Sequence, residues 1–267
     1  MSAFLFSLSS FLPALVAWVL FVCAVMLYAA QGARDSRQKL GEVDSKQKPA
    51  SAGVSADAKA LADKSAGTQE TGKEKPNTHL LSLVPHLLFG MLAWIAVWFR
   101  VAYAGFLTVT QYHIWSQSAF TRPLLSTPLD PEKSVGIAQQ FPWLFDTRLG
   151  YFIFYSWGRF WLGAVLSIGV ALCFWWFLRI LERRNGRFFL PGETDVGLLT
   201  ALLVGWPNIV IFIPLVFLGV IVVSLVRLLA FRERYTTLGW PFFIAAAVTL
   251  IWGSRLVELL NLGVLRV

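Results

Sequence analysis

Long apolar runs separated by short polar stretches dominate this chain of 267 residues. The first run covers residues 11–30, and a helix of about twenty residues is long enough to cross the roughly 30 Å hydrocarbon core of a bilayer. No Lys or Arg precedes this run, whereas basic residues follow it, which is typical of a spanning helix rather than of a secretory signal. The pattern therefore predicts an N-terminal transmembrane helix within residues 1–30.

Residues 31–77 have a different composition. They are rich in Lys, Ala, Ser, Gly and Asp and contain no aromatic residue. Such a segment buries too little apolar surface to offset the entropy that folding would cost. We expect a hydrophilic linker that is mostly disordered. The positive-inside rule assigns this linker to the cytoplasm and the N-terminus to the outside.

Residues 78–267 contain the remaining apolar blocks and form the predicted membrane domain. Residues 78–119 fit two helices with a turn at Arg100. Residues 141–180 fit two more, of which the helix over residues 161–178 has the clearest pattern. A single longer crossing in each block is equally consistent with the sequence.

Two further spans are expected within residues 196–226, divided near residues 205–207, and a last span covers residues 240–253. Basic residues cluster after the first span, around Arg183 and around Arg232. The positive-inside rule places these clusters on one side of the membrane, so an even number of crossings must separate them. We therefore predict an all-α polytopic helical bundle with about eight transmembrane helices, within a range of six to eight.

The composition supports this class and excludes others. The chain is 57% hydrophobic and 14% charged, whereas a soluble domain is roughly a quarter charged. The net charge of +8 comes largely from arginines that flank apolar runs, so a nucleic-acid partner is not expected. Cys23 and Cys173 form no CxxC pair and are expected to be buried, and His79, His86 and His113 lack metal-ligand spacing. The bilayer is the expected partner, and no metal or cofactor is predicted.

One stretch, FFLPGETDVGLL at residues 188–199, contains the candidate chemistry. Glu193, Thr194 and Asp195 immediately precede an apolar helix, and acidic residues inside the membrane are rare and often functional. A second interpretation is structural, because Thr or Asp before a helix commonly caps its free N–H groups. The residues alone leave both interpretations open.

Residues 163–199, together with LGWPF at residues 238–242, resemble the C-terminal half of the type IV prepilin peptidases. These are membrane aspartic proteases of the GxGD class, with the motif Gly-x-Gly-Asp-x-Lys-Leu at the start of a helix. The resemblance implies that Gly192 and Asp195 occupy the first Gly and the Asp of this motif. Asp195 is then one catalytic carboxylate of a membrane endopeptidase.

Several positions depart from the family pattern. Thr194 stands at the second Gly of the motif, and Gly197 stands at the Lys. The family has its first catalytic Asp about thirteen residues before a Pro-Leu-Leu sequence, which residues 120–125 resemble here. The corresponding position is Thr110, and no Asp or Glu occurs between Lys75 and Leu129.

The missing acid bears on the mechanism that the resemblance implies. An aspartic protease needs two carboxylates that share one proton, one to activate water and one to polarise the scissile carbonyl. Asp195 and the hydroxyl of Thr110 cannot form such a pair. The sequence therefore predicts that cleavage is impaired or lost, unless Asp130 or Asp146 folds back to Asp195. Residues 31–77 also lack the cysteines that bind zinc in the family and accompany its methyltransferase activity.

We therefore expect an inner-membrane protein of a bacterium that is similar to prepilin peptidases, with three possible roles. It is a divergent, inactive homologue that binds pilin-like precursors in type IV pilus or type II secretion assembly, or an active endopeptidase that removes their leader peptides. The third role is that of a small transporter or assembly scaffold in which the GETD sequence only caps a helix.

Overall fold

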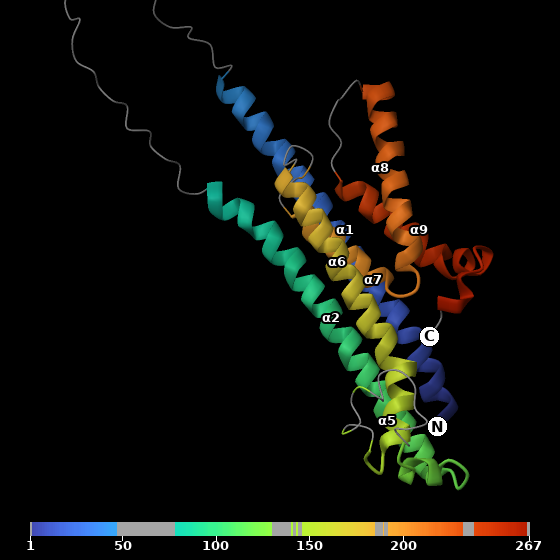
Figure 1. The fold of residues 1–267 in the computed structure, drawn as a ribbon. Helices are drawn as coiled ribbons and strands as arrows, with labels where there is room; N and C mark the ends of the chain where they lie inside the picture. The colour runs from blue at the N-terminus through green and yellow to red at the C-terminus, as the bar shows by residue number, and fades with distance from the viewer. Residues whose placement is uncertain are drawn as a thin grey trace, which may run out of the picture.

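The structure is a computed structural model and describes residues 2–46, 78–129, 140, 143, 146–184, 189, 192–231 and 238–265. Every regular element in these residues is helical. Figure 1 shows long helices packed along one another, with the short helix α7 among them. The elements are α1 (Ser2–Lys46), α2 (Thr78–Gln117), η1 (Arg122–Ser126), α5 (Gly150–Ser156), η2 (Trp157–Trp161), α6 (Leu162–Arg184), α7 (Glu193–Val204), α8 (Ile209–Phe231), α9 (Gly239–Leu259) and η4 (Leu262–Leu265).

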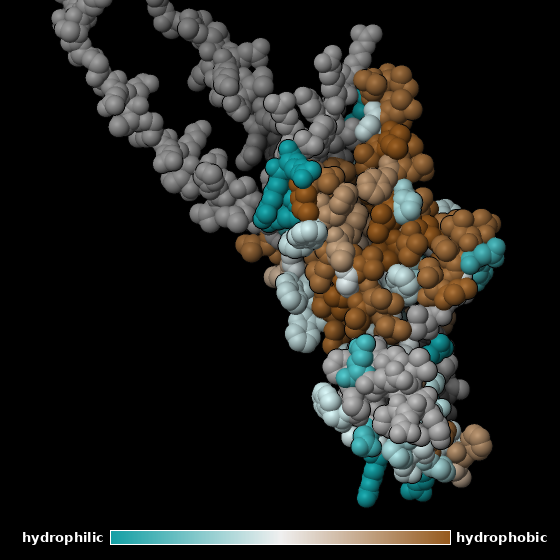
Figure 2. Space-filling view, in the orientation of Figure 1, coloured by the Kyte–Doolittle hydropathy of each residue, from teal (hydrophilic) through white to brown (hydrophobic). Residues whose placement is uncertain are grey.

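The predicted all-α membrane bundle is confirmed, but the predicted number of about eight transmembrane helices is not. Within the described residues, five helical stretches are long and apolar enough to cross a membrane. They are Phe11–Ala33, Leu87–Gln117, Gly150–Arg184, Ile209–Leu229 and Gly239–Leu259. Figure 2 shows a broad hydrophobic surface over the middle of the molecule, with most of the hydrophilic residues towards its ends.

The two long apolar blocks each form one crossing, which explains most of the difference in number. Helix α2 is continuous over 40 residues, so the prediction of a turn at Arg100 is wrong. No proline interrupts the sequence around Arg100, and its side chain finds hydrogen-bond acceptors on another helix. The elements α5, η2 and α6 likewise follow one another without a break from Gly150 to Arg184.

The predicted division near residues 205–207 is confirmed, although the helix before it is too short to cross a bilayer. Helix α7 has 12 residues and is therefore about 18 Å long. Gly205 ends it with a φ of 67°, in the left-handed region that glycine adopts without strain. Pro207 has no N–H group for a helical hydrogen bond. Helix α8 then runs back towards the end at which α6 finishes (Figure 1), so Arg227 near the end of α8 lies at the same end of the bundle as Arg183 and Arg184.

Two further predictions differ from the structure. Helix α1 continues to Lys46, so residues 31–46 of the predicted disordered linker are helical. Half of these 16 residues are Ala, Arg, Gln, Lys or Glu, which favour helices. The rest of the linker lies outside the described residues. Cys23 and Cys173 are exposed rather than buried. The outer surface of a membrane bundle faces lipid, where a thiol behaves as a small apolar group.

The core of the bundle is centred on α7. Ten of its 12 residues are buried, on all sides of the helix, and it contacts α1, α2, α6, α8 and α9. A helix that is apolar all round is stable only when other elements surround it. The rings of Phe174, Phe212 and Phe242 pack edge to face beside it. The candidate site lies at the N-terminal end of α7.

Candidate functional site

The motif at residues 192–197 begins helix α7, as the sequence predicts. Gly192 has a φ of 93°, and its carbonyl accepts hydrogen bonds from the N–H groups of Asp195 (3.1 Å) and Val196 (3.0 Å). The hydroxyl of Thr194 is fully buried and has no hydrogen-bond partner, so this side chain does not cap the helix. Gly192 therefore supplies the turn, and Thr194 is a packed core residue.

Glu193 is the buried acid of the motif, with a relative exposure of 1%. Its Oε1 atom accepts hydrogen bonds from the Tyr28 hydroxyl (3.0 Å) and the Gly239 N–H (2.9 Å), and Oε2 accepts one from the Leu238 N–H (3.2 Å). The first N–H groups of a helix have no partner within that helix, and its dipole favours a negative charge there. Glu193 therefore connects α7 to α1 and to the start of α9.

Tyr28 reaches this carboxylate by lying across Gly239. A Cβ atom at position 239 would come within 2.2 Å of the Tyr28 ring, so only glycine leaves room for this contact. The ring also packs against Trp240, at a centroid distance of 5.9 Å, and against Phe243, at 5.4 Å. The LGWPF sequence thus meets the GETD sequence through Gly239 and Glu193.

Asp195 has different surroundings and is partly exposed. One of its carboxylate oxygens accepts a hydrogen bond of 3.2 Å from the indole N–H of Trp175 on α6. The guanidinium of Arg179 lies over the Trp175 ring, 5.7 Å from its centroid, and forms an ion pair of 3.1 Å with Glu182. Residues two apart on a helix do not face each other, so the carboxylates of Asp195 and Glu193 point to different neighbours.

Thr110, which the predicted resemblance aligns with the first catalytic acid of the prepilin peptidases, is far from Asp195. Thr110 is partly exposed on α2, and its hydroxyl donates to the carbonyl of Phe106 (2.8 Å). Helices α2 and α7 run in the same direction, and Arg100 bonds to Leu202 near the end of α7. Thr110 lies ten residues beyond Arg100, and Asp195 lies seven residues before Leu202. At 1.5 Å per residue, the two positions are about 25 Å apart along the helix axes.

The two loop acids do not supply a described companion either. Asp130 lies outside the described residues. Asp146 is exposed just before α5, at the opposite end of the bundle from the start of α7. The helical stretch from Gly150 to Trp175 alone measures about 38 Å, so Asp146 does not reach Asp195. Asp195 thus accepts a hydrogen bond from an indole N–H group, and neither Thr110 nor Asp146 lies near its carboxylate.

Gly197, which stands at the family's Lys, is a packing position. A Cβ atom there would lie 2.4 Å from Cδ1 of Leu178 and 3.2 Å from the Phe242 ring. Glycine therefore allows α7 to approach α6 and α9 closely. In the described part of the chain, no group of three or more His, Cys, Asp or Glu residues could hold a metal ion.

Changing Gly197 to valine is expected to destabilise the bundle by about 1 to 3 kcal/mol, because the added methyl groups overlap Leu178 and Phe242. Gly169→Ala on α6 is the matched control, since its added Cβ meets no atom within 4 Å. This control is expected to stabilise helix α6 slightly, by up to about 1 kcal/mol. Unfolding in detergent, followed by tryptophan fluorescence, measures both effects. Equal midpoints for the two variants would contradict the packing role of Gly197.

The sequence singled out Asp195 as the functional acid of the motif but gave no role to Glu193. An acid within an apolar sequence was visible at both positions. The hydrogen-bond partners of Glu193 could not be predicted from the sequence, because Leu238 is 45 residues away and Tyr28 is 165 residues away. Comparisons of this chain with protein-family models, with curated proteins and with solved structures found no match.

Proposed function

We propose that this chain is a bacterial inner-membrane protein, similar to prepilin peptidases, that binds pilin-like precursors without removing their leader peptides. The contact between Glu193 and the N–H groups of Leu238 and Gly239 carries this proposal. The two stretches on which the resemblance rests, GETD and LGWPF, are distant in sequence and bonded to each other in the fold. A chance likeness in two separate apolar segments would not require such a contact.

The proposed loss of cleavage rests on the surroundings of Asp195. Its carboxylate accepts a hydrogen bond from the neutral indole of Trp175. Thr110 and Asp146 lie about 25 Å or more away, so they do not provide the second carboxyl group that the proton-sharing mechanism needs. A carboxylate that has no second carboxyl group beside it can bind a cationic group, but it cannot also polarise a scissile carbonyl.

The proposed binding mode places the precursor beside the N-terminal end of α7. The positive-inside rule assigns this end, where Arg183 and Arg184 end α6 and Arg227 lies near the end of α8, to the cytoplasm. The basic leader of a precursor would lie near the partly exposed Asp195, and its hydrophobic segment would lie in the bilayer beside the bundle. Trp176, next to the indole that bonds Asp195, is exposed and offers an apolar surface for that segment.

A co-purification assay tests this function. The full-length protein in a neutral detergent is mixed with a precursor that has a short basic leader and a hydrophobic segment, and mass spectrometry measures the retained precursor. We expect retention at full mass. Asp195→Lys should lower retention about tenfold, which corresponds to about 1.4 kcal/mol of repulsion against the leader. Asp146→Lys, at the opposite end of the bundle, should leave retention unchanged.

Other outcomes distinguish the remaining hypotheses. Leader removal by the unchanged protein that disappears in Asp195→Asn would establish the active endopeptidase and overturn the proposal. Neither retention nor cleavage would instead favour the transporter or scaffold role, in which the motif serves only the packing of α7.

A further inference from the structure

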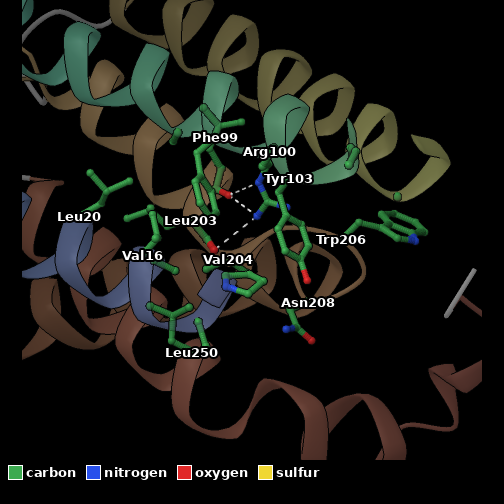
Figure 3. Close-up of a pocket in the computed structure, with 18 of the residues that line it drawn as sticks. Val16, Leu20, Phe99, Arg100, Tyr103, Leu203, Val204, Trp206, Asn208 and Leu250 are labelled. Carbon is green, nitrogen blue, oxygen red and sulfur yellow. Dashed lines mark hydrogen bonds between the residues drawn. The ribbon is translucent and has the colours of Figure 1, made fainter. Parts of the chain in front are cut away.

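A cavity of about 460 Å³ lies beside and beyond the C-terminal end of α7. It exists because α7 extends only about 18 Å into the bundle, while the neighbouring helices continue past it. Residues of α1, α2, α6 and α9 and of the turn after α7 form its walls (Figure 3). The volume is in the range of sites that bind small ligands.

All the charged residues that line this cavity are cationic. Arg100 and Arg159 are in the lining, and no Asp or Glu is. Arg100 donates to the Leu202 carbonyl through Nε (2.9 Å) and through Nη2, whereas its Nη1 makes no hydrogen bond to the described residues. Arg159 makes no hydrogen bond or ion pair with any described residue. Arg100 is partly buried and Arg159 is exposed, and both have guanidinium N–H groups available to an anion.

The local structure of the helix that contains Arg159 is also unusual. Residues Trp157–Trp161 form the π-helical segment η2 between α5 and α6. Short π-helical segments are rare and occur frequently at functional sites. This segment contributes Arg159 and Phe160 to the cavity wall.

The other residues that line the cavity indicate which chemical group is attached to the anion. Asn208 and Ser254 add polar groups near the arginines, while α1 contributes Pro13, Ala17 and Leu20 as an apolar wall. A small hydrated anion would gain nothing from that wall, whereas an anion attached to hydrocarbon would bury its chain there. The lining therefore fits an amphiphile with an anionic head.

We propose that this cavity binds the phosphate head group of an anionic lipid. The phosphate oxygens accept hydrogen bonds from Arg100 and Arg159, because the planar guanidinium matches phosphate geometry and remains charged at any physiological pH. The hydrocarbon chain lies along the apolar residues of α1. The site is separate from the motif at the other end of α7 and does not depend on precursor binding.

Native mass spectrometry of the full-length protein in a neutral detergent tests the site, with phosphatidylglycerol as the probe. We expect one tightly retained lipid per protein. Arg159→Gln should weaken its apparent affinity about tenfold, since it removes one charged hydrogen-bond donor from the phosphate. Arg148→Gln is the matched control, because Arg148 is an exposed arginine that does not line the cavity. The Arg148→Gln variant should bind phosphatidylglycerol with the same apparent affinity as the unchanged protein.

Two results would overturn the proposal. Equal affinities for Arg159→Gln and Arg148→Gln would show that the lipid binds elsewhere. Inorganic phosphate that displaces the lipid at equal concentration would show that the cavity is a site for a free anion, without a contribution from the hydrocarbon chain. Arg159→Gln is preferred to a change at Arg100, because Arg100 also bonds the end of α7 and its loss would alter the fold.

Discussion

Replacing Glu193 by alanine is expected to lower the free energy of unfolding by about 3 to 5 kcal/mol. The carboxylate accepts hydrogen bonds from the Tyr28 hydroxyl and from the N–H groups of Leu238 and Gly239. Its removal takes the acceptor away from the buried N–H of Gly239 and the partly buried N–H of Leu238, and each unsatisfied donor costs about 1 to 3 kcal/mol. It also removes a negative charge that the N-terminal end of α9 favours. Denaturation in mixed detergent micelles, followed by tryptophan fluorescence, measures the change.

Two further variants separate this role from a general effect of losing an acid. Glu193→Gln retains one carbonyl oxygen as an acceptor and is expected to lose about half as much stability. Glu182→Ala removes an acid that forms an ion pair with Arg179 within one helix, near the surface. Such pairs contribute less than about 1 kcal/mol. If Glu193→Ala were as stable as Glu182→Ala, Glu193 would not be a structural link between α1, α7 and α9.

The sequence predicted the membrane bundle because apolar runs must match the thickness of a bilayer. It did not fix the length of each helix, because Arg100 in the middle of an apolar block indicated a turn. A buried arginine is compatible with a continuous helix only if another element offers acceptors, and those acceptors are carbonyls about a hundred residues away. Those carbonyls belong to the short helix α7. The wrong prediction of a turn at Arg100 and the wrong prediction that α7 spans the membrane therefore have one physical cause.

The candidate site shows the same limit. The helix that follows Gly192 is a local feature, and the sequence located it. The roles of Glu193 and Asp195 depend on long-range contacts, with Tyr28 and Gly239 for the first and Trp175 for the second. Only the folded chain shows that the first acid is enclosed by three donors and that the second remains partly exposed. The predicted capping of α7 by Thr194 or Asp195 is not seen, because Gly192 is the N-cap and no described side chain bonds the first N–H groups of α7. Glu193 instead accepts hydrogen bonds at the start of α9.

Changing Arg100 to methionine is expected to destabilise the protein by about 3 kcal/mol, and the loss should be concentrated at the end of α7. The last carbonyl groups of a helix have no partner within it. Arg100 donates to Leu202 through two nitrogens and approaches Leu203 at 3.5 Å, in a bundle core that offers few other donors. Hydrogen bonds from a charged donor contribute about 1.5 to 3 kcal/mol. Methionine preserves the apolar length of the side chain but none of its donors.

Amide hydrogen exchange can show where in the bundle Arg100→Met lowers the stability. Amide hydrogen exchange should accelerate in the last turn of α7 and the following turn to Asn208, while the start of α9, which Glu193 holds, keeps its protection. Arg100→Lys should give an intermediate loss, because a single ammonium group does not reproduce the planar fork of the guanidinium. Arg148→Met, at an exposed position, should leave exchange and stability unchanged. Uniform acceleration throughout the bundle in Arg100→Met would show that Arg100 supports the whole core rather than the end of α7.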